Sequence, residues 1–156
     1  MNEWIRLLQD NDYLGIKKYI KNGADVNDSN DSEESVLACA LRYRCDDEII
    51  DLLVQSGADL NDFNEDGVNI LDYAIMYNKI DLVKKIIDSG INVNATTRPS
   101  RFTALMGAVC YGRIEIAKML LEKGADKNAV DSKGLSALGF AKKTHKKSMI
   151  KLLEES

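Results

Sequence analysis

The chain has 156 residues, of which 45% are hydrophobic and 29% are charged. This length and apolar content allow a buried core, which excludes an intrinsically disordered chain, and 10 Gly with 1 Pro exclude a collagen-like one. The formal net charge of −4 hides an asymmetry, because residues 1–78 sum to −11 and residues 79–156 sum to +7.

The first ten residues, MNEWIRLLQD, lack the basic flank and the continuous apolar stretch of a secretory signal. No apolar run is long enough to span a bilayer. The three cysteines, Cys39, Cys45 and Cys110, leave one thiol unpaired in any pairing, and no CxxC motif occurs. Reduced thiols are typical of the cytosol, so we expect a cytoplasmic (intracellular) protein that does not bind a membrane.

A five-residue phrase that begins with glycine occurs four times, as GADVN at 23–27, GADLN at 57–61, GINVN at 90–94 and GADKN at 124–128. Its glycines are 34, 33 and 34 residues apart. A second phrase (SVLACA, NILDYA, TALMGA, SALGFA) begins at Ser35, Asn69, Thr103 and Ser136, at steps of 34, 34 and 33. Two phrases with one period predict a repeat protein in which each unit buries its apolar face against its neighbours.

Each repeat predicts two helices. Ser35, Asn69, Thr103 and Ser136 stand where the first helix should begin, and each side chain can accept a hydrogen bond from a free amide of the first turn. The second helix carries apolar residues at helical spacing, and the glycine of the first phrase follows it as a left-handed terminator. Between repeats, segments such as 65–67 (EDG) predict tight turns at the tips of fingers.

This pattern resembles the ankyrin repeat family, whose unit of about 33 residues is a turn followed by two helices, with a T-P-L-H-x-A phrase. The copy most similar to it runs from 103 to 129 (TALMGAVCYGRIEIAKMLLEKGADKNA). The resemblance implies an all-α solenoid of stacked helix–turn–helix units with short β-hairpin or turn fingers, forming one domain over 1–156. Its expected parts are an N-terminal cap (1–29), three full repeats (30–63, 64–97, 98–130) and a C-terminal cap repeat (131–156).

The chain departs from the family phrase at several positions. Residues 36, 70, 104 and 137 replace the proline, and residues 38, 72, 106 and 139 replace the histidine. Glu33 in the first finger and Arg101 in the third finger stand in place of a glycine. The helix caps and the apolar spacing persist, so the fold prediction does not change.

The sequence offers little for catalysis or metal binding. His145, the single histidine, lies between lysines at the junction of the last two helices, and no nucleophile or carboxylate pair is expected beside it. Three scattered cysteines and one histidine lack the spacing of zinc ligands. Residues 107–113 (GAVCYGR) lack the lysine and hydroxyl of a phosphate-binding loop. We therefore predict no catalytic residue, no cofactor and no metal, with an enzyme as the remote alternative.

The resemblance implies a protein-interaction module that binds a polypeptide in a concave groove lined by finger tips and first helices. Tyr43, Tyr77 and Tyr111 recur at intervals of 34, so stacking would align them as an exposed ladder, or alternatively as an edge of the core. Phe63, Phe102 and Leu135 are expected to be exposed at finger tips. The candidate protein-binding residues are Tyr43, Tyr77, Tyr111, Arg42, Met76, Phe63, Asp66, Val68, Phe102, Leu135 and Lys143.

Charge also distinguishes the fingers, because the first (28–34) is acidic and the third carries Arg98 and Arg101. A partner along the groove would then present basic residues to the first repeats and acidic residues to the last ones, unless the charges only keep the array soluble. Five lysines at 142, 143, 146, 147 and 151 make nucleic-acid binding the alternative function. We expect a monomer that binds another protein as an inhibitor or adaptor.

Overall fold

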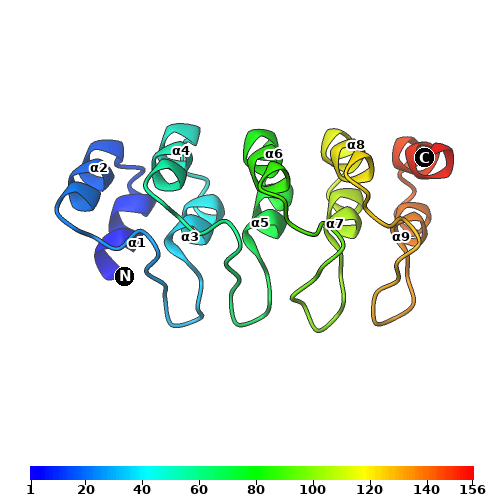
Figure 1. The fold of residues 1–156 in the computed structure, drawn as a ribbon, viewed down its shortest axis with the longest axis horizontal. Coiled ribbons are helices and arrows are strands. Elements are labelled where there is room, and N and C mark those ends of the chain that lie inside the picture. Colours follow the sequence, from blue (N-terminus) through cyan, green and yellow to red (C-terminus); the bar gives the residue numbers. More distant parts are fainter. The chain divides into compact units, whose positions relative to one another are not determined.

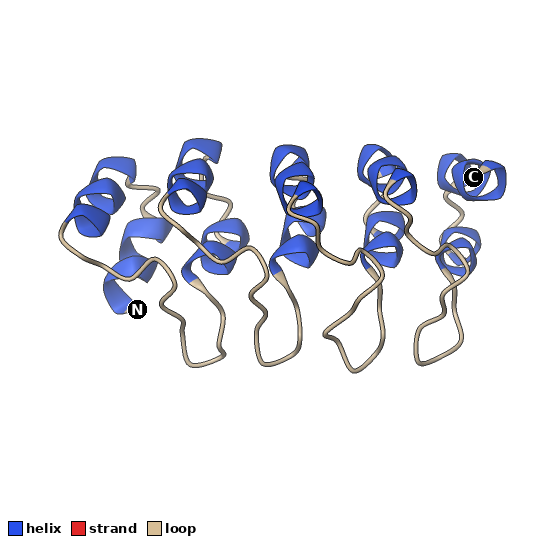
Figure 2. Cartoon of the chain, viewed as in Figure 1, coloured by secondary structure: helices blue, strands red, loops and turns tan.

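The computed structural model describes residues 1–156 and contains ten helices joined in pairs. Apart from three isolated β-bridges at the bases of fingers, all other residues form loops and turns (Figure 2). The predicted all-α class is confirmed. None of the helices is both long enough and apolar enough to cross a membrane. The pairs are α1 (Asn2–Gln9) and α2 (Tyr13–Lys21), α3 (Val36–Arg42) and α4 (Asp47–Gln55), α5 (Ile70–Met76) and α6 (Ile80–Asp88), α7 (Ala104–Cys110) and α8 (Ile114–Glu122), and α9 (Ala137–Lys143) and α10 (Lys147–Glu155).

The chain forms two compact units, the N-terminal unit (residues 1–73) and the C-terminal unit (residues 74–156). In the N-terminal unit, α1 packs against α3, and α2 packs against α4. In the C-terminal unit, α7 packs against α9, and α8 packs against both α6 and α10. Within each unit, first helices therefore stack on first helices and second helices on second helices. The fingers of each unit project from the side opposite the second helices (Figure 1).

Two of the first helices, α3 and α7, are buried over most of their length. Residues 36–41 of α3 and residues 104–109 of α7 all lie in the core. These two segments are short apolar runs rather than amphipathic helices, which suits elements covered on both sides. The second helices are amphipathic instead. In α6, Leu82, Val83, Ile86 and Ile87 are buried, whereas the two lysines Lys84 and Lys85 are exposed.

The four predicted helix caps are confirmed. Asn69 Oδ1 accepts a hydrogen bond from the amide of Asp72 (2.8 Å), and Asp72 Oδ2 accepts one from the amide of Asn69 (3.1 Å). The hydroxyls of Ser35, Thr103 and Ser136 accept the equivalent bond from the amide three residues later. These caps determine the residue at which each finger ends and the first helix begins.

An asparagine in the glycine phrase connects successive repeats. Asn27 Nδ2 donates to the carbonyl of Gly57 (3.1 Å), and Asn27 Oδ1 accepts from the amide of Asp59 (2.8 Å). In the C-terminal unit, Asn94 makes the same two bonds to the next glycine phrase, at 3.0 and 2.7 Å. The side chain satisfies one donor and one acceptor of the neighbouring backbone, which explains an asparagine at this position of the repeat.

A side chain at the base of the finger holds three of the fingers in shape. Asn64 Oδ1 accepts hydrogen bonds from the amides of Asp66 (3.1 Å) and Val68 (2.9 Å). Asn30 and Asp131 make the equivalent pairs of bonds in their own fingers. Such bonds give a turn a defined shape without a regular hairpin.

The finger position that favours glycine has a left-handed backbone whichever residue occupies it. Gly67 and Gly134 have φ of 75° and 81°, and Glu33 and Arg101 have φ of 57° and 54°. The first and third fingers therefore keep this turn despite their departures from the family phrase. Holding a non-glycine residue in this region costs of the order of 1 kcal/mol.

Candidate functional site

Three of the five exposed large apolar side chains lie on a finger or at the end of a first helix. Phe63 in the second finger is 50% exposed, Val130 in the fourth finger is 46% exposed, and Tyr111 at the end of α7 is 45% exposed. The other two exposed large apolar residues, Leu14 and Ile80, lie on second helices. An exposed ring on a finger adds nothing to the core, so these positions are candidates for contact with a partner.

The three candidate tyrosines occupy equivalent positions and lie outside the core. Tyr43 and Tyr111 are the C-cap residues of α3 and α7, and Tyr77 directly follows α5. Tyr43 and Tyr77 are half-buried. The guanidinium of Arg42 lies over the ring of Tyr43, 4.5 Å from its centroid. Each ring keeps some accessible surface, and their alignment as a ladder stays a prediction.

Two candidates differ from the expectation that they are exposed at finger tips. Phe102 is half-buried, with its ring edge-on to Phe140 and the ring centroids 5.5 Å apart. Leu135 is also half-buried. Both side chains cover a glycine of a first helix, because they lie 3.6 and 3.2 Å from the positions that a Cβ would take at Gly107 and Gly139. The expectation that Phe102 and Leu135 are exposed at finger tips is wrong. Gly107 and Gly139 have no side chains, and the space this leaves is partly filled by the two apolar side chains.

The remaining candidates occupy both exposed and half-buried positions. Asp66 in the second finger and Lys143 at the end of α9 are exposed, whereas Val68 and Met76 are half-buried. The side chain of Arg42 is 41% exposed. The structure therefore brings Arg42 and Tyr43 together as a stacked pair.

The N-terminal unit contains a buried carboxylate that the sequence did not single out. Glu34, at the base of the first finger, has a side chain only 8% exposed. Its Oε1 accepts hydrogen bonds from the hydroxyl of Tyr73 (2.8 Å) and Nε of Arg42 (2.9 Å). Its Oε2 accepts from Nη2 of Arg42 (2.9 Å), Nδ2 of Asn30 (3.0 Å) and the thiol of Cys39 (3.4 Å). We call these five residues the Glu34 network.

The charges in the Glu34 network stabilise one another. Burial acts to raise the pKa of Glu34, but hydrogen bonds from Arg42, Tyr73 and Cys39 lower it below its ordinary value overall. Burial and the adjacent carboxylate raise the pKa of Tyr73, and they raise that of Cys39 to about 12. The hydrogen bond to Glu34 raises the pKa of Arg42. Cys39 therefore stays a protonated thiol at neutral pH, which does not suit a nucleophile.

Sequence reasoning placed Arg42 on the partner-binding surface and left Glu34 unassigned. In the structure Arg42 also links the finger base to the ring of Tyr43, and its role in partner binding stays a prediction. A glutamate directly before a helix cap, with an arginine eight residues later, was the only signal in the sequence. Tyr73, which also donates to Glu34, belongs to the next repeat.

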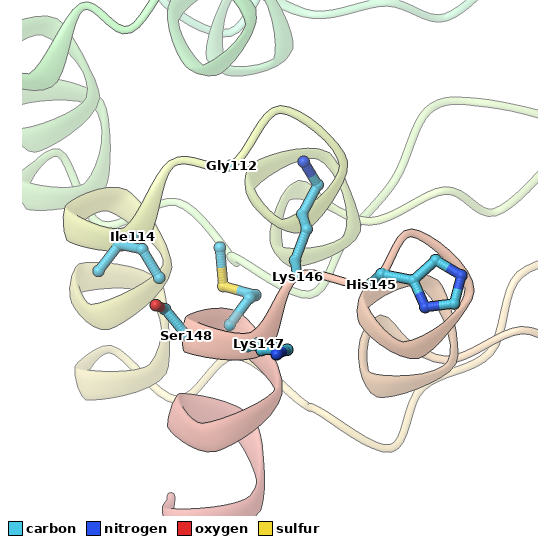
Figure 3. A pocket seen from close by; sticks show the side chains of 7 residues that line it. Gly112, Ile114, His145, Lys146, Lys147 and Ser148 are labelled. Atoms are coloured by element: carbon cyan, nitrogen blue, oxygen red, sulfur yellow. The ribbon is translucent and has the colours of Figure 1, made fainter.

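The C-terminal unit contains a cavity of about 390 Å³, which we call the Lys146 pocket (Figure 3). His145, one of its lining residues, is exposed and lies in a left-handed turn (φ 56°). No group of three or more His, Cys, Asp or Glu side chains is placed to hold a metal ion. The pocket is lined by Gly112, Ile114, His145, Lys146, Lys147, Ser148 and Met149.

Comparison with known proteins assigns the repeats to a family. Residues 6–97 match the family model that describes three copies of the ankyrin repeat, and residues 100–132 match the model of a single ankyrin repeat. A search among curated proteins found no matching relative. Ankyrin repeats are generally protein–protein interaction modules and are typically non-catalytic. With more than half of its length matched and its helices paired and capped in the same register, this chain belongs to the ankyrin repeat family, and its fold is an all-α repeat solenoid.

Proposed function

We propose that this protein is a non-catalytic interaction module that binds a polypeptide with its fingers and the ends of its first helices. The observation that carries this proposal is the exposure of Phe63, Tyr111 and Val130 on those elements. Such residues gain nothing in folding from their position, whereas a partner that covers them gains the free energy of removing apolar surface from water.

The proposed contact residues come from both units. Phe102 and Leu135 contribute only the accessible part of half-buried side chains. The tyrosines supply wide contact area with few rotatable bonds, which makes ordering them on binding inexpensive. The proposed set is Arg42, Tyr43, Phe63, Asp66 and Val68 in the N-terminal unit, and Met76, Tyr77, Phe102, Tyr111, Val130, Leu135 and Lys143 in the C-terminal unit.

Charge defines the segments that each unit would favour. The N-terminal unit carries −11 and the C-terminal unit carries +7. The former would attract basic segments of a partner and the latter acidic ones, which raises the association rate and fixes orientation. The hydrogen bonds within the fingers and the Glu34 network order the surface before binding, so little conformational entropy is lost.

The biological role follows from occupying a partner's surface, either to block it as an inhibitor or to hold it as an adaptor. We propose that the protein acts as a monomer in the cytoplasm. All three cysteines are free thiols, and two of them are buried, which suits a reducing compartment.

An affinity capture from the native host tests this function. The bait is the wild-type chain beside a variant with Tyr43, Tyr77 and Tyr111 changed to alanine, and the control is a Leu14→Ala/Ile80→Ala variant. The control removes exposed apolar side chains from second helices. We expect the wild type and the control to capture the same protein and the tyrosine variant to lose it. Equal capture by all three baits would contradict the proposed surface.

Nucleic-acid binding is the second candidate, favoured by the charge of +7 in the C-terminal unit. It predicts a gel shift with duplex or single-stranded oligonucleotides that weakens steeply with salt, because each phosphate contact releases counterions. Changing the lysines at 142, 143, 146, 147 and 151 would abolish that shift. Absence of any shift at moderate salt would remove this candidate.

A further inference from the structure

The Lys146 pocket has an apolar floor and a basic rim. Met149, which is 1% exposed, and the half-buried Ile114 form the apolar part. Lys146 extends toward Gly112, and the hydroxyl of Ser148 is directed toward Ile114 (Figure 3). No finger residue and no aspartate or glutamate lines the pocket. It is therefore a surface separate from the fingers, with a positive charge and a polar donor above an apolar base.

Lys146 lacks the acceptors that its counterparts in other repeats have. Cys45, two residues before α4, donates to the carbonyl of Leu8 near the end of α1 (3.2 Å). Arg113, the residue before α8, donates to the last two carbonyls of α5 (3.1 and 2.7 Å). The ammonium of Lys146 makes no hydrogen bond to protein and lies 3.6 Å from the position that a Cβ would take at Gly112. The Lys146 residue as a whole is half-buried.

Two carboxylates on α8 and α10 pair with other lysines. Glu115 pairs with Lys118 (3.7 Å), and Glu154 pairs with Lys142 (3.7 Å). Neither Lys146 nor Lys147 forms an ion pair within the protein. The pocket therefore keeps an uncompensated positive charge, and an anionic group that enters it would be stabilised by a charge-assisted hydrogen bond.

We propose that the Lys146 pocket binds a carboxylate side chain of an acidic polypeptide segment. Lys146 and Lys147 would hold the carboxylate, Ser148 would donate a hydrogen bond, and the methylene groups of the bound residue would pack on the accessible part of Ile114. The volume of about 390 Å³ lies at the small end of the range for ligand sites, which suits one or two side chains. The apolar floor favours an amino-acid side chain over a nucleic-acid backbone, which needs an open basic track.

A binding titration tests this pocket directly. The probe is a short fluorescein-labelled peptide of consecutive glutamates, with a glutamine peptide of equal length as its control, and fluorescence anisotropy is the readout. We expect the wild type to bind the glutamate peptide and not the glutamine peptide. The variant Lys146→Met/Lys147→Met should bind it at least about tenfold more weakly, because both cations are lost.

The matched control is Lys84→Met/Lys133→Met, which removes two exposed lysines of the same unit and changes the net charge equally. It should bind like the wild type, and circular dichroism should show that both variants fold. Amide signals of Gly112 and Ser148 should shift on titration of labelled protein. No binding, equal loss in both variants, or tighter Lys146-dependent binding of an oligonucleotide would overturn the proposal. None of the three tyrosines changed in the capture experiment lines the pocket, so failure of this proposal can be distinguished from failure of the proposed function.

Discussion

Individual side chains hold the N-terminal finger in place, and Glu34 is the most consequential of them. Its two carboxylate oxygens accept hydrogen bonds from the finger, from α3 and from Tyr73. Removal of the charge would leave the guanidinium of Arg42 without its anion. The same change would leave the ring of Tyr43 without a fixed neighbour, which connects stability to the proposed binding surface.

We predict that Glu34→Gln lowers the free energy of unfolding by about 1–3 kcal/mol, the usual cost of an unmatched buried hydrogen-bonded group. Urea denaturation measures it, with the exposed Glu65→Gln as the control that should change little. The pH dependence supplies a second readout. The pKa of Glu34 in the folded state lies below its ordinary value of 4.5, so its contribution is complete above that pH and is lost on acidification.

The Glu34→Gln variant should therefore lose less stability than the wild type when the pH falls below about 4.5. Parallel stability curves for the two proteins across this range, or a variant as stable as the wild type at neutral pH, would contradict the stabilising role of the carboxylate.

The left-handed backbone at Gly134 and Arg101 predicts that exchanging glycine and non-glycine residues there changes the free energy of unfolding in opposite directions. Gly134→Ala should lower the free energy of unfolding by about 1 kcal/mol, because the position has φ of 81° and nothing lies within 4 Å of a new Cβ. Arg101→Gly, at φ of 54°, relieves the same strain, partly offset by the greater entropy of an unfolded glycine. It should be neutral or slightly stabilising. Thermal unfolding of both variants checks this, and a destabilised Arg101→Gly protein would argue against strain there.

At the scale of elements, the parts that could be predicted from the sequence are those set by local contacts. The caps at Ser35, Asn69, Thr103 and Ser136 bond to amides three residues away, so a short segment determines them. The burial of Phe102 was not predictable in this way, because it depends on Phe140 of the next repeat. The same holds for the Glu34 network, whose tyrosine lies 39 residues away in the sequence.

At this scale, Arg113 gives a prediction about stability. It is the N-cap residue of α8, and its side chain caps the C-terminal end of α5. Its guanidinium donates to the carbonyls of Ile75 and Met76, where a cation also interacts favourably with the helix C-terminus. Arg113→Ala should lower the free energy of unfolding by about 2 kcal/mol. Lys118→Ala, which breaks only a surface pair on α8, should cost less than about 0.5 kcal/mol. Similar losses in the two variants on chemical denaturation would contradict the capping role.

At the scale of the whole molecule, the sequence period and the charge distribution both have structural counterparts. The period of 33 or 34 residues corresponds to successive helix pairs, and the acidic and basic halves coincide with the two compact units. The period could be recognised in the sequence because the same side chain makes the same hydrogen bonds to the backbone in each unit, as Asn27 and Asn94 do. The identity of a partner is not encoded in this way, since the exposed residues differ from repeat to repeat.

The affinity of a captured partner for the Tyr111→Ala variant tests the central claim most directly. Tyr111 is 45% exposed at the end of a first helix, so its ring should matter for binding and little for folding. Isothermal titration calorimetry should show binding weakened by more than about 1 kcal/mol, with a nearly unchanged Tm and with Ile80→Ala binding like the wild type. Unchanged affinity, or a large fall in Tm, would contradict a binding surface made of fingers and first-helix ends.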